Sequence, residues 1–309
     1  MRLAPIVLFT YDRLWHTQKT IDALKNNELA SKSELIIYSD GAKNKSAYES
    51  VSQVRDYVRT VDGFKKVTII TRDKNWGLAN SIIDGVTQVI KKYGKVIVLE
   101  DDLVTSPFFL RYMNDALEFY KDEDKVMHVS GYIYPIDNNK LSDTFFIKPD
   151  TCWGWATWDR AWQYFKKDTD YYLNIFNKKM IRDFNLNGSF DHFKQIKANK
   201  NGRIETWAIY WYASTYLQNG LSLHPSESFV SNIGHDGNGV HCAKTSIYDV
   251  DLIANYSISF TNQIKEDKIA RVRLENYFNS TKVPFIIRVI NRLNKFYEKN
   301  IKKNISVDI

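Results

Sequence analysis

The chain has 309 residues, of which 44% are hydrophobic and 26% are charged, the composition of a globular protein with a sizeable core. Of the net charge of +7, +5 lies between residues 283 and 303, which argues against a broad nucleic-acid-binding surface on the remainder. Two cysteines, Cys152 and Cys242, give no disulfide framework, and no apolar run reaches membrane-spanning length, so we expect a soluble chain in a reducing compartment, the cytoplasm.

Strand and helix patterns alternate through the first 130 residues. Each expected strand is an apolar, β-branched run, and the residues between strands carry apolar positions at helical spacing. Strict alternation predicts a parallel sheet with helices on both faces. Ser106-Pro107 is expected to supply the N-cap and first residue of the fourth helix. Strands are expected at 3–10, 34–39, 66–71, 96–99 and 125–130, and helices at 15–27, 46–59, 78–93 and 107–120.

The pattern changes after residue 130. Residues 152–162 hold four Trp, which could stack on sugar faces or fill the core. Residues 163–203 read as polar and irregular, with weak helical signals in 171–184. A helix is expected from near Thr206, directly after Glu205, and residues 231–242 form a Gly-rich segment that is either a binding loop or a surface turn. His128 lies in an apolar strand pattern and is expected to be buried with its hydrogen bonds satisfied.

Three consecutive carboxylates, Glu100, Asp101 and Asp102, follow the run at 96–99. Adjacent anions repel each other unless a cation lies against them. Mg²⁺ and Mn²⁺ take oxygen ligands and commonly join a few carboxylates to substrate phosphates, so a metal that holds a phosphate is one explanation. The alternative is an acidic first turn of the next helix, where the helix dipole favours negative charge.

Ligands of parallel α/β sheets bind at the carboxyl ends of the strands. At that edge we expect residues 10–13, 40–41, 73–80 and 100–102 to gather. The chain contains no G-x-G-x-x-G after its first strand and no G-x-x-x-x-G-K-[ST], which disfavours dinucleotide-binding and P-loop sites. A nucleotide site made of separate carboxylates and a metal fits this sequence better.

With these segments in place, the chain resembles GT-A glycosyltransferases over residues 3 to about 245. It is most similar to the inverting branch that includes the N-acetylglucosaminyltransferase initiating complex N-glycans, and it also resembles bacterial capsule and lipopolysaccharide transferases. The resemblance implies a Rossmann-like, mostly parallel α/β sheet flanked by helices. The matching motifs are Ala4-Pro-Ile-Val-Leu-Phe9 with Asp12-Arg13, Tyr38-Ser-Asp-Gly41, Asn75-Trp-Gly-Leu-Ala-Asn80, Val98-Leu-Glu-Asp-Asp-Leu-Val-Thr-Ser-Pro-Phe-Phe109, Trp153-Gly-Trp-Ala-Thr-Trp158, and Asn232-Ile-Gly with Gly239-Val-His241.

The resemblance also implies roles for single residues. Asp102 matches the carboxylate that contacts Mn²⁺ or Mg²⁺, and His241 matches a late histidine that reaches the metal or the diphosphate, with His235 as a second candidate. Glu205 matches the position of the catalytic base, against the alternative of a carboxylate favoured by a helix N-terminus. The expected donor-binding residues are Thr10, Arg13, Asp40, Asn80, Glu100 and Asp101, with Asp40 reading the nucleotide base.

The expected function is therefore metal-dependent, inverting transfer of a hexosyl or N-acetylhexosaminyl group in bacterial surface polysaccharide synthesis. The donor would be a nucleotide sugar, with a UDP-sugar favoured, and the acceptor a glycan or lipid-linked oligosaccharide. The alternative is a non-catalytic glycan- or nucleotide-binding domain with the same shell. No nucleic-acid partner is expected.

We expect a catalytic domain at 1–262, divided into a nucleotide-sugar half (1–150) and an acceptor half (151–262), followed by a helical tail at 263–309. Within this tail, residues 283–303 combine an apolar stripe with six Lys or Arg. That pattern is typical of a helix on the surface of an anionic membrane, here the inner face of the plasma membrane. A helix that covers the catalytic domain or a dimer contact explains the same stripe.

Overall fold

A computed structural model describes residues 2–237 and 245–282. His241 and the basic segment 283–303 lie outside the described residues, so their predicted roles remain predictions. In the described part no helix is both long and apolar enough to cross a bilayer.

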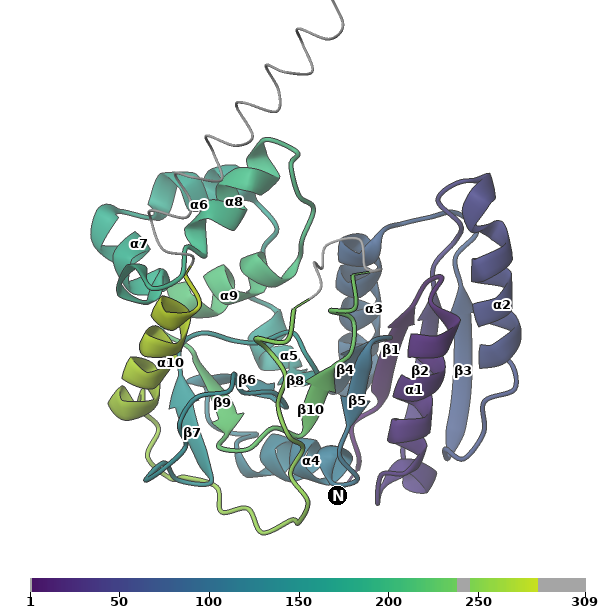
Figure 1. Cartoon of the computed structure of the whole chain (residues 1–309), viewed down its shortest axis with the longest axis horizontal. Coiled ribbons are helices and arrows are strands. Elements are labelled where there is room, and N and C mark those ends of the chain that lie inside the picture. The colour runs from purple at the N-terminus through teal and green to yellow at the C-terminus, as the bar shows by residue number, and fades with distance from the viewer. Residues whose placement is uncertain (1, 238–244, 283–309) are drawn as a thin grey trace, which may run out of the picture.

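The first half alternates strands and helices as the sequence predicts, and Figure 1 shows β1 to β3 with α1 and α2 on one side of the molecule. Most bounds lie within two residues of the predicted ones. After the fourth strand, β5 pairs with the distant β10 (Val230–Asn232) in a separate two-stranded sheet. The elements are β1 (Ile6–Thr10), α1 (Leu14–Lys25), β2 (Glu34–Ser39), α2 (Tyr48–Val58), β3 (Lys66–Thr71), α3 (Leu78–Tyr93), β4 (Lys95–Glu100), β5 (Leu103–Thr105), α4 (Phe109–Phe119) and β6 (Val126–Ser130).

The second half adds strands to the same sheet and a group of short helices beside α9 (Figure 1). The region 163–203, expected to be polar and irregular with weak helical signals in 171–184, contains three α-helices and a short 3-10 helix. Side chains of Asp168 and Asn177 cap two of them by accepting hydrogen bonds from backbone N–H groups. The elements are β7 (Thr144–Ile147), β8 (Trp155–Trp158), α5 (Asp159–Trp162), α6 (Thr169–Ile175), α7 (Lys178–Phe184), α8 (Phe193–Lys200), α9 (Ala208–Leu217), β9 (Leu221–Pro225), β10 (Val230–Asn232) and α10 (Lys268–Ser280).

The described strands of the main sheet run in the order β3-β2-β1-β4-β8-β6-β9-β7. The pairs β1–β2, β1–β4, β2–β3 and β6–β9 are parallel, whereas β8 is antiparallel to both β4 and β6, and β7 is antiparallel to β9. The sheet is therefore mixed, and strict β/α alternation ends where β8 inserts between β4 and β6. The strands of the predicted nucleotide-sugar half (1–150) and acceptor half (151–262) interleave in one sheet, because β8 lies between β4 and β6 and β9 lies between β6 and β7.

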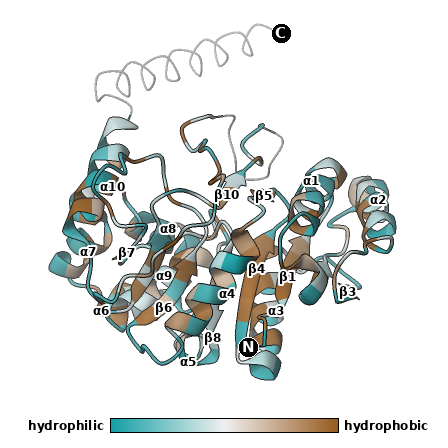
Figure 2. Cartoon of the chain, turned by 90° about the horizontal axis from the view of Figure 1, so that it is seen from below, coloured by the Kyte–Doolittle hydropathy of each residue, from teal (hydrophilic) through white to brown (hydrophobic). Residues whose placement is uncertain are grey.

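Strand β1 shows why the central strands are apolar throughout. Ile6 and Leu8 belong to one buried cluster, with side chains of α1 and α4, and Val7 and Phe9 belong to another, with side chains of α3. Because successive side chains of a strand point to opposite faces, a strand covered on both faces has no polar face. In Figure 2 the hydrophobic colour is accordingly concentrated on the central strands and on α3.

The predicted cap at Ser106-Pro107 is wrong by two residues, because α4 begins at Phe109. The β5–β10 pairing keeps the chain extended through Thr105, and the N–H of Ser106 continues it with a 2.8 Å bond to the carbonyl of Phe229. Ser106 still closes the turn before the helix, since its Oγ accepts from the N–H of Phe108 at 3.3 Å.

Candidate functional site

The carboxyl ends of β1 and β4 bring Arg13 against the acidic triplet. Phe9 and Glu100 are partners in the parallel ladder, so the residues after each strand lie side by side. The Arg13 guanidinium donates to Asp101 Oδ1 at 3.1 Å and to Asp102 Oδ2 at 2.7 Å. The backbone N–H of Tyr11 adds a 3.3 Å bond to Asp101 Oδ2. The cation that the triplet requires is thus supplied, in the described structure, by the protein itself.

Burial makes it energetically unfavourable for this cluster to carry three negative charges. Burial raises the pKa of Glu100 to about 8, the charges of Asp102 and Asp101 add to the rise, and Arg13 and the indole of Trp207 oppose it. Burial and Asp102 likewise raise the pKa of Asp101 to about 6, against the stabilising contacts of Arg13 and Tyr11. Near neutral pH, Glu100 therefore retains a proton for much of the time.

Replacing Arg13 tests how far this ion pair stabilises the fold. The Arg13, Asp101 and Asp102 side chains are only 22%, 10% and 12% exposed, so Arg13→Met leaves two poorly hydrated carboxylates without their cation. We expect the free energy of unfolding in urea at pH 7 to fall by about 3 kcal/mol. The loss should shrink toward pH 5, because the raised pKa of Asp101, about 6, lets that carboxylate take up a proton there. Arg59→Met, at an exposed ion pair with Asp56, should change stability by less than about 0.5 kcal/mol; equal losses would refute the argument.

Asp40, at the end of β2, is buried and accepts four hydrogen bonds from the protein. The N–H groups of Gly41 and Trp76 donate to Oδ1, each at 2.8 Å, and the N–H of Gly77 and the amide of Asn75 donate to Oδ2 at 2.9 and 3.1 Å. A carboxylate has about four acceptor positions, so none remains for a nucleotide base in this arrangement. Asp40 fixes the loop that leads into α3.

Glu205 lies in the segment that leads into α9 and contacts the first turn of α3. Its Oε1 is 3.1 Å from Lys167 Nζ and accepts a 3.5 Å bond from the amide of Asn80. Two residues later, Trp207 contacts Glu100. The short segment 205–207 therefore links predicted donor-binding residues on α3 and β4, and the Glu205 side chain is 61% exposed and accessible to a second substrate.

The segment after β10 covers Asp102 from another direction. The Ile233 N–H donates to the Asp102 carbonyl at 2.9 Å, and a Cβ built on Gly234 would lie 2.1 Å from Asp102 Oδ2. Only glycine permits this close approach of backbone to carboxylate. His235, the next residue, packs its ring against Trp153, with centroids 5.3 Å apart.

Of the other residues expected at this edge, Thr10 ends β1 and is buried, with its carbonyl accepting from the Asp40 N–H at 3.0 Å. Trp155 and Trp158 are core residues, which excludes sugar stacking for these two, whereas Trp153 is half-buried beside His235. Among the described residues no three His, Cys, Asp or Glu side chains converge on one point as a complete metal site.

The sequence reasoning missed Asp150, which lies on the connection from β7 to β8. Two buried histidines hold this connection: His224 Nε2 is 3.0 Å from the Pro149 carbonyl, and His128 Nε2 is 3.1 Å from the Thr151 carbonyl. His128 Nδ1 accepts from the indole of Trp211 at 3.0 Å, which confirms the expected buried, hydrogen-bonded histidine. Asp150 Oδ2 is buried and has no hydrogen-bond partner in the described structure.

Burial raises the pKa of Asp150, so its folded-state pKa exceeds the unfolded one. The unfolded chain then releases this proton at lower pH than the folded chain, and the free energy of unfolding falls as pH rises above about 4. Asp150→Asn should remove this dependence and stabilise the protein by about 1 kcal/mol at pH 8, with little effect at pH 4. Urea titrations at pH 4 and pH 8 measure the free energy of unfolding of the variant and of the wild type. The exposed Asp124→Asn is the control, and a destabilised Asp150→Asn at pH 8 would count against the reasoning.

Residues 6–194 match the sequence model of a family described as glycosyl transferase family 2, more than half of the chain. The chain belongs to glycosyl transferase family 2. Together with the mixed sheet and its flanking helices, this membership identifies it as a GT-A glycosyltransferase, which confirms the predicted fold class and the general activity. The narrower resemblance to the N-acetylglucosaminyltransferase branch stays a prediction.

Two solved structures resemble this family 2 glycosyltransferase at low identity. S. aureus TarS is 14% identical over 41% of this chain, with a TM-score of 0.30. A mannosyltransferase from Pyrobaculum calidifontis, PcManGT, solved in complex with GDP-Man and Mn²⁺, is 11% identical over 71% of this chain and 70% of its own, with a TM-score of 0.41. The chain spans only 21% of TarS. No curated protein matches it.

Proposed function

We propose that this enzyme is a metal-dependent, inverting transferase that moves a sugar from a nucleotide sugar to a glycan or lipid-linked acceptor. One observation carries the proposal: Asp101 and Asp102 are held together by Arg13 at the ligand-binding edge of the sheet, and Glu205 lies across that edge beside Asn80. Inverting transfer requires cationic groups at the leaving diphosphate and a base on the acceptor side, and this arrangement offers both.

Asp102 is the proposed protein ligand of Mn²⁺ or Mg²⁺. Its carboxylate is a hard oxygen donor, and Gly234, which has no Cβ, lets the backbone pass close to Oδ2 without displacing it. A small number of protein ligands is expected for such ions, because substrate phosphates and water complete the coordination. The bound metal would neutralise charge on the departing diphosphate. His241, outside the described residues, is proposed as a further contact to the metal or diphosphate.

The donor-binding residues divide into two groups by their hydrogen bonds. Arg13 is the proposed cation for the donor phosphates, while Asp101 and Glu100 would face the ribose and the sugar. Thr10 and Asn80 border the same edge. Asp40 acts by holding the loop before α3, since its four acceptor positions are already used.

Glu205 is the proposed base that takes the proton of the acceptor hydroxyl. Its exposed carboxylate can reach an incoming acceptor, and Asn80 and Lys167 orient it. We further propose a UDP-sugar donor, a hexosyl or N-acetylhexosaminyl group, and an acceptor on the bacterial surface-polysaccharide pathway. We also propose that the basic C-terminal segment, residues 283–303, attaches the enzyme to the inner face of the plasma membrane.

A panel of nucleotide sugars with and without Mn²⁺ tests this function. One nucleoside diphosphate should raise the midpoint of thermal unfolding, and only when the metal is present, because the two ligands bind each other as well as the protein. At a hundredfold excess over its dissociation constant the ligand should stabilise the fold by about 2.7 kcal/mol. Slow hydrolysis of the matching nucleotide sugar should accompany the shift. No response to any nucleotide would contradict the proposal.

A further inference from the structure

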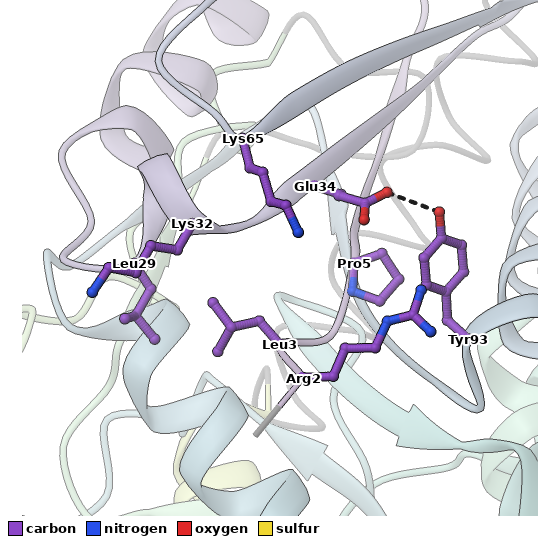
Figure 3. Close-up of a pocket in the computed structure, with 8 residues that line it drawn as sticks. All are labelled: Arg2, Leu3, Pro5, Leu29, Lys32, Glu34, Lys65 and Tyr93. Atoms are coloured by element: carbon purple, nitrogen blue, oxygen red, sulfur yellow. Dashed lines mark hydrogen bonds between the residues drawn. The ribbon is translucent and has the colours of Figure 1, made fainter.

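A cavity of about 310 Å³ lies at the end of the sheet opposite the acidic triplet. Pro5 just before β1, Glu34 at the start of β2, Lys65 just before β3 and Tyr93 at the end of α3 all line it (Figure 3). These are the amino ends of strands whose carboxyl ends form the catalytic edge. The five residues of β1 separate the two sites by roughly 17 Å.

Three cations and one carboxylate line this pocket: Arg2, Lys32 and Lys65 against Glu34. Glu34 accepts a 2.9 Å hydrogen bond from the hydroxyl of Tyr93. Arg2 lies over the Tyr93 ring, 4.8 Å from its centroid. Within the described chain, none of the three cations lies within 4.0 Å of a carboxylate oxygen. The lining therefore carries a net charge of +2 that no carboxylate in residues 2–237 and 245–282 pairs.

The helix dipole does not account for these cations. The negative end of α3 already has Lys91 and Lys92 in its last turn. Lys65 precedes a strand, and its amine points into the open space between Leu3 and Glu34 in Figure 3. Like charges gathered around a concave surface strengthen the local positive potential, which attracts an anion of matching charge.

The chemistry of the lining indicates the class of anion. A phosphate monoester carries a charge of about −1.5 to −2 near pH 7, which matches the unpaired +2. Guanidinium and ammonium groups are the common protein partners of phosphate. The remaining lining, Leu3, Pro5 and Leu29, is apolar and suits the carbon skeleton of a small ester. A volume of this size lies at the lower end of small-molecule sites, about 300 to 1,000 Å³.

We propose that this pocket binds a phosphate monoester of sugar-phosphate size, at a site separate from the catalytic edge. Binding there does not require the proposed transfer reaction. The phosphate lies beside the Lys65 amine, which points into the pocket, with Arg2 and Lys32 at the rim, and the organic part contacts the apolar lining. Since the pocket and the acidic triplet occupy opposite ends of the strands, an occupant of one does not compete with an occupant of the other.

Isothermal titration calorimetry with glucose 6-phosphate tests the proposal on the full chain, with glucose as the neutral control. Lys65→Gln and Arg2→Gln should each weaken binding at least tenfold, because each removes a cation from the lining. Lys66→Gln is the matched control, since it removes the same charge one residue away, at an exposed position that does not line the pocket. Asp102→Asn should leave the affinity unchanged, which separates this site from the proposed donor site.

Vesicles of phosphatidic acid and of phosphatidylcholine distinguish a lipid phosphate from a soluble one. Binding of glucose 6-phosphate that depends on Lys65 assigns a soluble ester. Binding only to phosphatidic-acid vesicles, with the same dependence on Lys65, assigns a lipid headgroup. Absence of binding to both probes at millimolar concentration, or equal weakening by Lys65→Gln and Lys66→Gln, would overturn the proposal.

Discussion

Asp102→Asn is expected to lower kcat/KM for sugar transfer by about a thousandfold. The substitution keeps the shape of the side chain and removes the charge that the proposed metal needs. A metal at a departing diphosphate contributes several kcal/mol of transition-state stabilisation, and about 4 kcal/mol corresponds to this factor. Mn²⁺ titration by calorimetry in the presence of the nucleoside diphosphate should show weakened metal binding in parallel.

Two controls keep this result specific. Asp124→Asn removes an exposed carboxylate that is not one of the proposed site residues, so it should leave kcat/KM unchanged. Circular dichroism should show that the Asp102→Asn variant is folded, because Arg13 retains its 3.1 Å contact with Asp101. Metal-dependent transfer within tenfold of the wild type would show that Asp102 is not the metal ligand.

Glu205→Gln is expected to reduce kcat by a factor of about 10² to 10⁴, the usual contribution of a general base. Glutamine can still accept the bond from Asn80 and preserves the volume of the side chain, so KM for the donor should change little. The acidic limb of the pH dependence of kcat should disappear, because the group that must be deprotonated is gone.

The pH profile separates a base from a residue that only positions the segment 205–207. Lys167→Met removes the ion pair with Glu205 but keeps the carboxylate, and it should retain the acidic limb. Glu49→Gln, on an exposed face of α2, is the matched control for loss of a glutamate. A Glu205→Gln enzyme with threefold or smaller loss of kcat would exclude Glu205 as the base.

The sequence was sufficient for the first half of the fold because its signals are local and strong. Strand β3 and helix α3 have the predicted bounds, since an apolar run or a helical stripe ends at clear polar or Gly positions. Helices α6 and α7 were indicated only by weak signals in 171–184, although Asp168 and Asn177 are good N-cap residues, and α8 was missed. Their polar sequences carry little periodicity, and packing against α9 stabilises them.

Other features depend on contacts between distant segments. The antiparallel insertion of β8 beside β4 pairs residues about sixty positions apart, and nothing in the Trp-rich run specifies that partner. The edge rule did predict that Arg13 would lie near the triplet. It could not predict that Asp40 would accept three of its four hydrogen bonds from Asn75, Trp76 and Gly77, or that Asp150 Oδ2 would be buried.

The β4–β8 ladder has a mechanical consequence for the catalytic cycle. Because strands of both predicted halves alternate in one sheet, a hinge between the halves would have to break the β4–β8 pairs from Lys95–Trp158 to Val98–Trp155. It would also have to break the β6–β8, β6–β9 and β7–β9 pairs. Substrate entry and product departure must therefore rely on side chains and connecting segments at the rim, while the scaffold beneath stays rigid. The enzyme should keep the same radius of gyration in solution X-ray scattering with and without nucleotide.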